Sequence, residues 1–281
     1  MGGSIGAAAR KAAVARTVVG IDPRDADTAV ALGMIDAVLS SIDDIACLQR
    51  PHGEPPFRIG VLVAAPIAAC DSIFAALESL HARCPLAWVT DIASSKHGVL
   101  AAVKAHLRGL ASRFVSSHPM AGSERQGAAA GHPGLISGAR VLISPLPTTD
   151  AGITAELESF WLSLGGVPSP MPIEDHDTLL AMISHLPHAL AFSLASAIAS
   201  TPMAGAAQAL HGGGLRDTTR IAASSPELWA DIMIDNRQCI LDVWSQWELH
   251  ARAIQKALER QDRELLVSLL ADASNWRKGF L

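Results

Sequence analysis

The stretch RIGVLVAA at residues 58–65 predicts a strand at the core of the fold. Its unbroken apolar run is typical of a strand in a parallel sheet that is covered on both faces. Pro66 ends the run, and Asp71 is placed to cap a helix that reaches about Arg83. A buried strand followed by a helix is the unit from which doubly wound α/β sheets are built.

Downstream of this strand, the alternation of strands and helices continues. Strands are predicted at residues 86–92, 113–117, 141–144 and 167–171, and helices at residues 95–110 and 153–164. We therefore expect an α/β fold, a doubly wound, Rossmann-like parallel sheet, over residues 1–172. After Pro172 no convincing strand follows, and large apolar residues recur at helical spacing from Trp229 to Leu258, with Pro226 in the first turn of that helix. Residues 173–281 are expected to form a second, all-α helical domain.

Upstream of residue 58, the chain carries part of a dinucleotide-binding unit. That unit consists of a strand, a glycine-rich turn, a helix and a second strand that ends in an acid. Gly2 and Gly3 lead into a helix-forming run at residues 7–15, and the strand RTVVGID at residues 16–22 ends in Asp22. The first strand and the first two glycines of GxGxxG are missing, so a flexible glycine-rich terminus is the alternative interpretation. Because the first strand is central in this architecture, we expect coding sequence upstream of Met1 that supplies it.

Composition excludes several classes of protein. The chain has 281 residues, 49% of them hydrophobic, a net charge of -5 and no cluster of Lys and Arg, which argues against nucleic acid or an anionic membrane as a partner. Its four cysteines are scattered without a CxxC pair, so no zinc or redox site is indicated and a reducing cytoplasm fits. The apolar run at residues 178–204 contains His185, Pro187 and His188, which predicts a buried helix pair rather than a membrane span. The absence of tyrosine excludes dehydrogenases that use a tyrosine as acid or base.

Four motifs carry the polar residues of a candidate site. They are DIASSK at residues 91–96, HPMAGSE at 118–124, SHLPH at 184–188 and GGGLRDTTR at 212–220. In this order they resemble the prephenate/arogenate (cyclohexadienyl) dehydrogenase family, the oxidoreductases of tyrosine biosynthesis, and the resemblance runs from Met1 to about Trp276. It implies NAD(P)-dependent oxidative decarboxylation of prephenate to 4-hydroxyphenylpyruvate, of arogenate to tyrosine, or of both. The ring is the electron sink, so no metal is expected.

The catalytic residues that the resemblance implies are His118 and Ser94. Each follows a predicted strand, so both are expected at the carboxyl edge of the sheet, where ligands bind. His118 is the candidate general base, because an unperturbed histidine has a pKa of about 6.5. Ser94 would hydrogen-bond the reacting hydroxyl or His118, or cap the following helix. Lys96 matches a residue of the family motif, but a solvated charge on a helix is the alternative interpretation. Ser123 and Glu124 are weaker candidates for residues that support the site.

A dicarboxylate substrate needs cationic and polar partners. Arg220 matches the substrate arginine of the family, since a guanidinium can hold a carboxylate with two hydrogen bonds; an ion pair is the alternative. Arg216 is expected to pair with Asp217 instead. The resemblance also implies that the substrate contacts Ser184, His188, Gly213 and Trp229. If the family resemblance is set aside, Ser184 and His188 are interpreted as hydrogen-bonded polar residues of the core, and Trp229 as a residue that packs in the core.

The cofactor-binding residues are expected at the N-terminus. Gly2, Gly3 and Ser4 match the end of the glycine fingerprint, and Asp22 would favour NAD by repelling a 2′-phosphate. Asp22 before Pro23 is otherwise a turn residue, and Arg24 leaves NADP open. The family also implies a homodimer built through the helical half, which is rich in large apolar residues.

Two other functions remain as alternatives. A β-hydroxyacid-type dehydrogenase would use a lysine on a helix of the second domain, but Lys256 and Lys278 lie in no such motif. A non-catalytic dimeric binding protein with a lost nucleotide site is supported only by the missing first strand. An assay for NADH formation with prephenate separates the enzyme from the binding protein.

Overall fold

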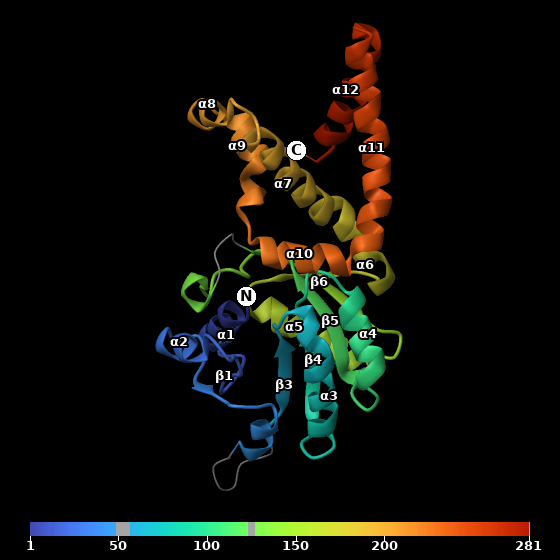
Figure 1. Ribbon diagram of the computed structural model, residues 1–281. Helices are drawn as coiled ribbons and strands as arrows, with labels where there is room; N and C mark the ends of the chain where they lie inside the picture. Colours follow the sequence, from blue (N-terminus) through green and yellow to red (C-terminus); the bar gives the residue numbers. More distant parts are fainter. Residues whose placement is uncertain (49–56, 123–126, 281) are drawn as a thin grey trace.

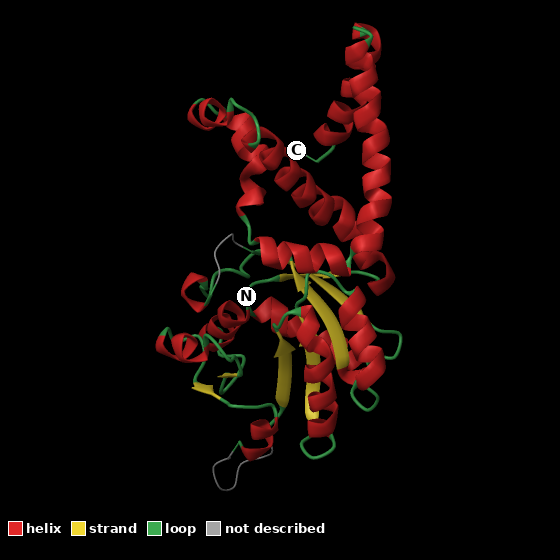
Figure 2. Cartoon of the chain, viewed as in Figure 1, coloured by secondary structure: helices red, strands yellow, loops and turns green. Residues whose placement is uncertain are grey.

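The computed structural model describes residues 1–48, 57–122 and 127–280. An α/β half comes first and a helical half follows it (Figures 1 and 2). The last strand ends at Pro170 and the first helix of the second half begins at Ile173. The expected combination of a Rossmann-like sheet and an all-α half is confirmed.

The main sheet has five strands in the order β3-β4-β5-β6-β7. They are β3 (Ile59–Val63), β4 (Leu86–Asp91), β5 (Phe114–Pro119), β6 (Arg140–Pro145) and β7 (Val167–Pro170). The first three pair in parallel, whereas β6 runs antiparallel to β5 and parallel to β7. The reason lies in the connections. Helix α5 (Ala151–Ser163) crosses over between β6 and β7, but the described part of the β5–β6 connection holds only the short 3₁₀ turn Ala128–Ala130.

Helices cover both faces of this sheet. On one face α3 (Cys70–His81) and α4 (His97–His106) pack through Phe74, Leu77 and Val99, and on the other α1 (Gly2–Lys11) and α5 pack through Ile5 and Trp161. Neighbouring residues of β5 point to opposite faces, since Phe114 belongs to the first core and Val115 to the second. Burial on both faces explains the unbroken apolar strands. Residue 71 is not the cap of α3, which begins at Cys70 after Ala69.

The N-terminal strands form a sheet of their own. Strands β1 (Val19–Gly20) and β2 (Ala37–Val38), joined through α2 (Ala26–Ala31), pair with each other but not with β3. The expected strand at residues 16–22 is therefore only two residues long, and the expected helix begins earlier, at Gly2. Among the described residues, no strand pairs with the free side of β3. Between β2 and β3 lies the 3₁₀ turn Asp43–Cys47.

The helical half begins with one continuous run from Ile173 to Ala199. It consists of α6 (Ile173–Leu180), a π-helical turn (Ala181–His185) and α7 (Leu186–Ala199), so the expected helix pair is a single helix with a wider turn. Pro187 has no N–H to offer the carbonyl of residue 183, which accounts for the irregular turn. By length and composition this run could cross a membrane. Only 28% of its most apolar window is buried, less than expected for a core helix.

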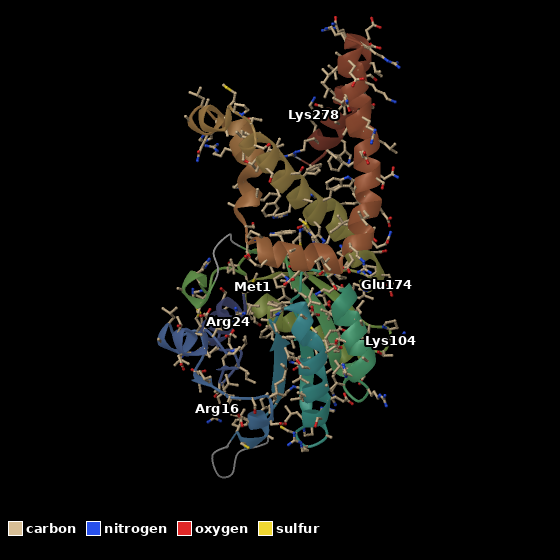
Figure 3. All side chains as sticks on the ribbon, in the orientation of Figure 1. Met1, Arg16, Arg24, Lys104, Glu174 and Lys278 are labelled. Atoms are coloured by element: carbon tan, nitrogen blue, oxygen red, sulfur yellow. The ribbon has the colours of Figure 1, made fainter. Side chains whose placement is uncertain are left out.

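The remaining helices are α8 (Ala204–Ala209), α9 (Gly213–Thr219), α10 (Pro226–Asp235), α11 (Arg237–Glu259) and α12 (Arg263–Lys278), with a 3₁₀ turn at Arg220–Ala223. The helix expected from Pro226 onward breaks at Asn236. Helix α10 lies across the end of the sheet, and α11 stands away from it (Figure 1). Figure 3 shows side chains standing out from α11, while Met1 lies near the junction of the two halves.

Candidate active site

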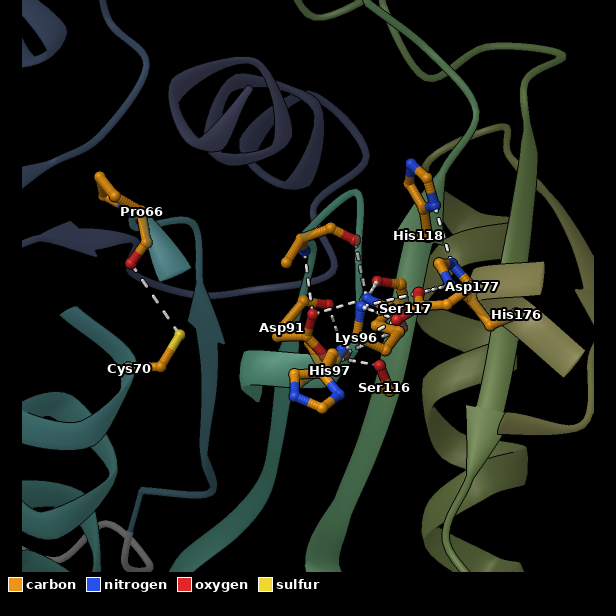
Figure 4. Close-up of polar contacts among 12 residues, drawn as sticks. Pro66, Cys70, Asp91, Lys96, His97, Ser116, Ser117, His118, His176 and Asp177 are labelled. Carbon is orange, nitrogen blue, oxygen red and sulfur yellow. Dashed lines mark hydrogen bonds and ion pairs between the residues drawn. The ribbon is translucent and has the colours of Figure 1, made fainter. Parts of the chain in front are cut away.

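His118 lies at the carboxyl end of β5, where the sheet meets the helical half. Its side chain is buried, and its Nδ1 lies 3.0 Å from Nε2 of His176, a fully buried residue of α6. His176 Nδ1 in turn lies 2.8 Å from Oδ1 of Asp177. Figure 4 shows these three side chains in a row, with the other ring nitrogen of His118 directed away from His176. The helical half therefore supplies the partners of the proposed base.

Asp177 also binds the first amides of α4. Its carboxylate accepts hydrogen bonds from the backbone N–H of Lys96 at 2.8 Å and of His97 at 2.9 Å. Asp235, at the end of α10, accepts from the N–H of Gly98 at 2.9 Å. Two carboxylates of the helical half thus satisfy the free donors at this helix N-terminus, where negative charge is favoured. Ser94 is not the cap, because α4 begins at His97 and its N-cap residue is Lys96, whose own side chain makes no capping hydrogen bond.

Lys96 forms a buried ion pair beneath the histidines. Its Nζ lies 2.6 Å from Oδ2 of Asp91, and both side chains are 1% exposed. The ammonium also donates to the carbonyls of Ala93 and Ser117, and Ser116 Oγ donates to Asp91 at 2.7 Å. Lys96 is therefore not a solvated charge. A fully hydrogen-bonded pair of this kind fixes the β4–α4 loop and places a positive charge near His118.

Burial keeps the histidines of this region neutral. Burial and then the charge of Lys96 hold the pKa of His118 well below its ordinary value of 6.5. Burial also lowers the pKa of His176, against the hydrogen bond to Asp177 that raises it. Although burial alone would raise it, the pKa of Asp177 is lowered by its hydrogen bonds from His176 and the Lys96 amide. At neutral pH the row therefore consists of two neutral imidazoles and one carboxylate.

A second cluster comes from the SHLPH motif and α10. The rings of His188 and Trp229 are stacked, with centroids 3.5 Å apart, and His188 Nδ1 donates to the carbonyl of Ser184 at 2.8 Å. His185 meets the edge of Trp229 at 6.0 Å, and burial lowers its pKa to about 4. The backbone of Ser94 acts to raise that pKa, so Ser94 lies near this ring, although His185 Nε2 makes no hydrogen bond with any of the described residues. The structure thus brings Ser94, Ser184, His188 and Trp229 to one region.

Arg220 lies close to this cluster, since its charge lowers the pKa of His188, after burial and against the Ser184 carbonyl. It is exposed at the start of a 3₁₀ turn, and no carboxylate of the described residues forms an ion pair with it. Arg216 pairs with Asp217 at 3.1 Å, as expected. Gly213 begins α9, and a Cβ there would meet nothing closer than Asp217 Oδ2 at 3.8 Å. Packing within the chain therefore does not require glycine at position 213.

The cofactor-binding candidates lie at the start of α1 and the end of β1. A Cβ on Gly2 would come within 2.9 Å of Ala64 Cβ, just beyond β3, and one on Gly3 within 2.8 Å of Met34 Sδ. Ser4 is buried, and its Oγ accepts from the N–H of His132 at 3.1 Å. Asp22 is exposed; the amides of Asp25 and Arg24 donate to it and lower its pKa. It stays ionised, as an acceptor of ribose hydroxyls must.

His176 and Asp177 are the residues that the sequence did not single out. They lie at the start of a polar helix, 58 residues from His118 in sequence, and only the packing of α6 against β5 brings them together. Ser123 and Glu124 lie outside the described residues. Among the residues that the structure describes, no group of three His, Cys, Asp or Glu side chains could hold a metal.

Comparison with known proteins gives the family. The family model for the nucleotide-binding domain of prephenate dehydrogenase matches residues 5–168, and that for its dimerization domain matches residues 172–272. Prephenate dehydrogenase of Bacillus subtilis is 31% identical, covering 99% of this chain and 73% of the relative. Cyclohexadienyl dehydrogenase of Zymomonas mobilis is 30% identical, covering 77% of this chain and 73% of the relative.

Solved structures agree with this result. Prephenate dehydrogenase of A. aeolicus, in complex with hydroxyphenyl propionate and NAD+, superimposes with a TM-score of 0.84 at 29% identity, covering 99% of this chain and 94% of that one. Arogenate dehydrogenase of Synechocystis shares the fold, with a TM-score of 0.77 at 24% identity over 99% of this chain and 96% of that one. The order of the motifs, the two matched domains and the shared fold lead to one conclusion: the chain belongs to the prephenate dehydrogenase family.

Proposed function

We propose that this chain catalyses the NAD-dependent oxidative decarboxylation of prephenate, of arogenate, or of both. The observation that carries the proposal is His118, a buried and neutral histidine at the carboxyl end of β5 with one ring nitrogen directed away from its protein partner. Such a nitrogen can accept the proton of a ring hydroxyl. The relatives named prephenate and cyclohexadienyl dehydrogenase supply the substrate class.

His118 takes the proton of the ring hydroxyl, while a hydride leaves the ring carbon that bears this hydroxyl. NAD, when bound, accepts that hydride. The bond between the ring and its carboxylate then breaks and CO₂ leaves. The electron pair of that bond makes the ring aromatic and turns the new carbonyl into a phenolate, which takes the proton back from His118. Ser94, in the loop after β4, would hydrogen-bond the reacting hydroxyl or His118 and hold the hydroxyl in place.

The other carboxylate of the substrate binds to Arg220 in this proposal. A guanidinium without a carboxylate partner among the described residues is available for two parallel hydrogen bonds. Ser184, His188, Gly213 and Trp229 would line the same site. The stacked pair of His188 and Trp229 offers a flat apolar wall with a polar edge, which suits a six-membered ring bearing oxygen substituents.

The N-terminal residues fit NAD. Gly2 and Gly3 allow α1 to approach Ala64 and Met34 at distances that a side chain would prevent, which is the packing role of the last fingerprint glycine. Ser4 lies in the same first turn. The ionised Asp22 would accept the ribose hydroxyls and repel a 2′-phosphate, so NAD is favoured over NADP.

The two halves divide the work in this proposal. Residues 1–172 bind the cofactor, while residues 173–281 bind the substrate and form a homodimer, as the match to a dimerization domain supports. The dimer partner, rather than a membrane or a nucleic acid, covers the apolar surface of α7. We place the enzyme in the cytoplasm, where the small-molecule cofactor and substrate are found.

One set of initial rates tests the function. Prephenate and arogenate are each combined with NAD and with NADP, and reduced cofactor is followed by absorbance. We expect reduction with at least one substrate and NAD, and slower reduction with NADP. A folded protein that reduces neither cofactor with either substrate would instead be a binding protein.

A further inference from the structure

The row formed by His118, His176 and Asp177 fixes where protons can lie. Asp177 also accepts from the amides of Lys96 and His97, so its carboxylate is held as an acceptor. His176 Nδ1 at 2.8 Å must therefore carry the proton of that bond. His176 is neutral, so its Nε2 carries none and can only accept. The nitrogen 3.0 Å away, His118 Nδ1, must donate, which leaves His118 Nε2 bare.

We infer that His176 and Asp177 are positioning residues that hold His118 in the one tautomer able to act as a base. The inference rests on the proposed role of His118 as proton acceptor. In the opposite tautomer, Nε2 would carry a proton and could not accept one from the substrate. Neither residue touches the reacting atoms, so each acts through the His118 ring.

The same row stabilises the charge that forms in the reaction. When the substrate O–H bond breaks and the His118 Nε2–H bond forms, the ring becomes an imidazolium that donates from Nδ1 to His176. Asp177 provides the negative charge at the end of the row. The ammonium of Lys96 opposes this positive charge, but Asp91 neutralises Lys96 at 2.6 Å, and His185, with a pKa of about 4, is uncharged at neutral pH. Asp177 is therefore the negatively charged group that stabilises the His118 imidazolium through the hydrogen bonds of the row.

Asp177 further ties this arrangement to the contact between the two halves. Its Oδ1 faces His176 Nδ1 and also accepts from the Lys96 amide at 2.8 Å, while its Oδ2 accepts from the amides of Lys96 at 3.1 Å and His97 at 2.9 Å. The base is therefore in its competent tautomer when α6 lies against the N-terminus of α4. This contact places the residues of the SHLPH motif beside the sheet at the same time.

The variant Asp177→Asn tests the inference directly. Only the Oδ2 position accepts from both the Lys96 and the His97 amide, so the asparagine oxygen should take that position and its NH₂ group, in the Oδ1 position, should face His176. His176 Nδ1 would then accept, its Nε2 would donate, and His118 would bear its proton on Nε2. We expect kcat to fall about 10²-fold or more with little change in KM for either ligand.

Nitrogen NMR on ¹⁵N-histidine-labelled full-length protein reads the tautomer without substrate or cofactor. We expect His118 Nδ1 to be protonated and Nε2 bare in the native chain, and the reverse in Asp177→Asn. Assignments come from His118→Asn and His176→Gln. Asp235→Asn is the matched control, because Asp235 caps the same helix from the same half but contacts neither histidine. It should leave both the ring protonation and kcat unchanged.

Variants at His176 guard against simple loss of folding. Glutamine can still accept from His118, so His176→Gln should retain more activity than His176→Leu at equal structural integrity by circular dichroism.

In a His118→Asn background, Asp177→Asn should cause no further loss of kcat. The inference would be overturned if Asp177→Asn lowered kcat as much in the His118→Asn background as it does in the native chain. It would also be overturned if the Asp177→Asn variant kept the native tautomer of His118 and a kcat within threefold of native. A native-like kcat for His118→Asn alone would instead reject the proposed base and leave the NMR result standing.

Discussion

At the scale of single residues, the site depends on histidines that remain neutral. Burial lowers the pKa of His118, His176 and His185, the last to about 4. Neutral imidazoles can accept protons and cost less to bury than charged ones. The same burial that prepares His118 as a base therefore makes the folded protein sensitive to acid.

The free energy of unfolding should fall as the pH drops below about 6.5. There, the unfolded chain protonates these histidines and the folded chain does not, so stability is lost until the lower folded pKa values are passed. Each such histidine contributes a slope of roughly 1.4 kcal/mol per pH unit. Urea unfolding between pH 7 and 5 measures it, and His185→Gln should reduce the slope by one histidine's share. A flat profile over this range would contradict the assignment.

His118→Asn should lower kcat by about 10²–10⁴-fold with smaller effects on KM, because asparagine cannot take the hydroxyl proton. Steady-state rates with prephenate and NAD measure the change. Melting temperature serves as the control for folding. A variant with near-native kcat would show that another group accepts the proton.

Arg220→Gln should raise KM for the substrate by a factor corresponding to roughly 2–4 kcal/mol, because the charged partner of a carboxylate is lost. KM for NAD should stay the same. The matched control is Arg216→Gln, whose guanidinium is already paired with Asp217 at 3.1 Å. If the cofactor KM moves instead, Arg220 belongs to the nucleotide site or to the contact between halves.

At the scale of elements, the apolar strands could be predicted because burial on both faces leaves a clear pattern. All five strands of the main sheet were expected within a few residues of their positions. The direction of β6 could not be predicted, since it depends on whether the chain crosses over or turns back after Pro119. The π-helical turn and the break at Asn236 likewise lie within continuous apolar patterns that predict regular helix.

The candidate site shows the same limit. His118, Ser94 and Arg220 could be proposed because they lie in recognisable motifs. From its sequence context, Lys96 is expected on the surface of a helix. It is buried instead, because Asp91 and two backbone carbonyls surround its ammonium. His176 and Asp177 gain their importance only from the packing of α6 on β5, a contact that no local pattern contains.

Strand β3 gives a prediction about packing. A Cβ on Gly60 would lie 2.2 Å from the ring of Trp88, which itself packs against Phe160 at 5.4 Å. Gly60→Ala should therefore destabilise the protein by about 1–3 kcal/mol in urea unfolding. Gly205→Ala on α8, where a Cβ meets nothing within 4 Å, is the control and should be neutral or slightly stabilising. Equal stabilities would mean that Trp88 can move aside.

At the scale of the whole molecule, the helical half exposes more apolar surface than a separate monomer would be expected to. The run from Ile173 to Ala199 has a mean hydropathy of 1.4 in its most apolar window, yet only 28% of that window is buried. Ile183, Leu194, Leu241 and Leu249 are exposed on this run and on α11. Exposed apolar surface on this scale is typical of an interface. The match of residues 172–272 to a dimerization domain indicates which partner to test first, a second copy.

The chain should be a dimer at micromolar concentration by light scattering. Leu194→Asp, on α7, should weaken the dimer, because it places a charge in an interface that excludes water. The matched control is Leu162→Asp on α5, which is 60% exposed in the other half and should leave the mass unchanged. Because dimer formation stabilises the folded state by mass action, the native melting temperature should rise with protein concentration. A native monomer at micromolar concentration, or a dimer that Leu162→Asp disrupts and Leu194→Asp does not, would move the interface away from α7.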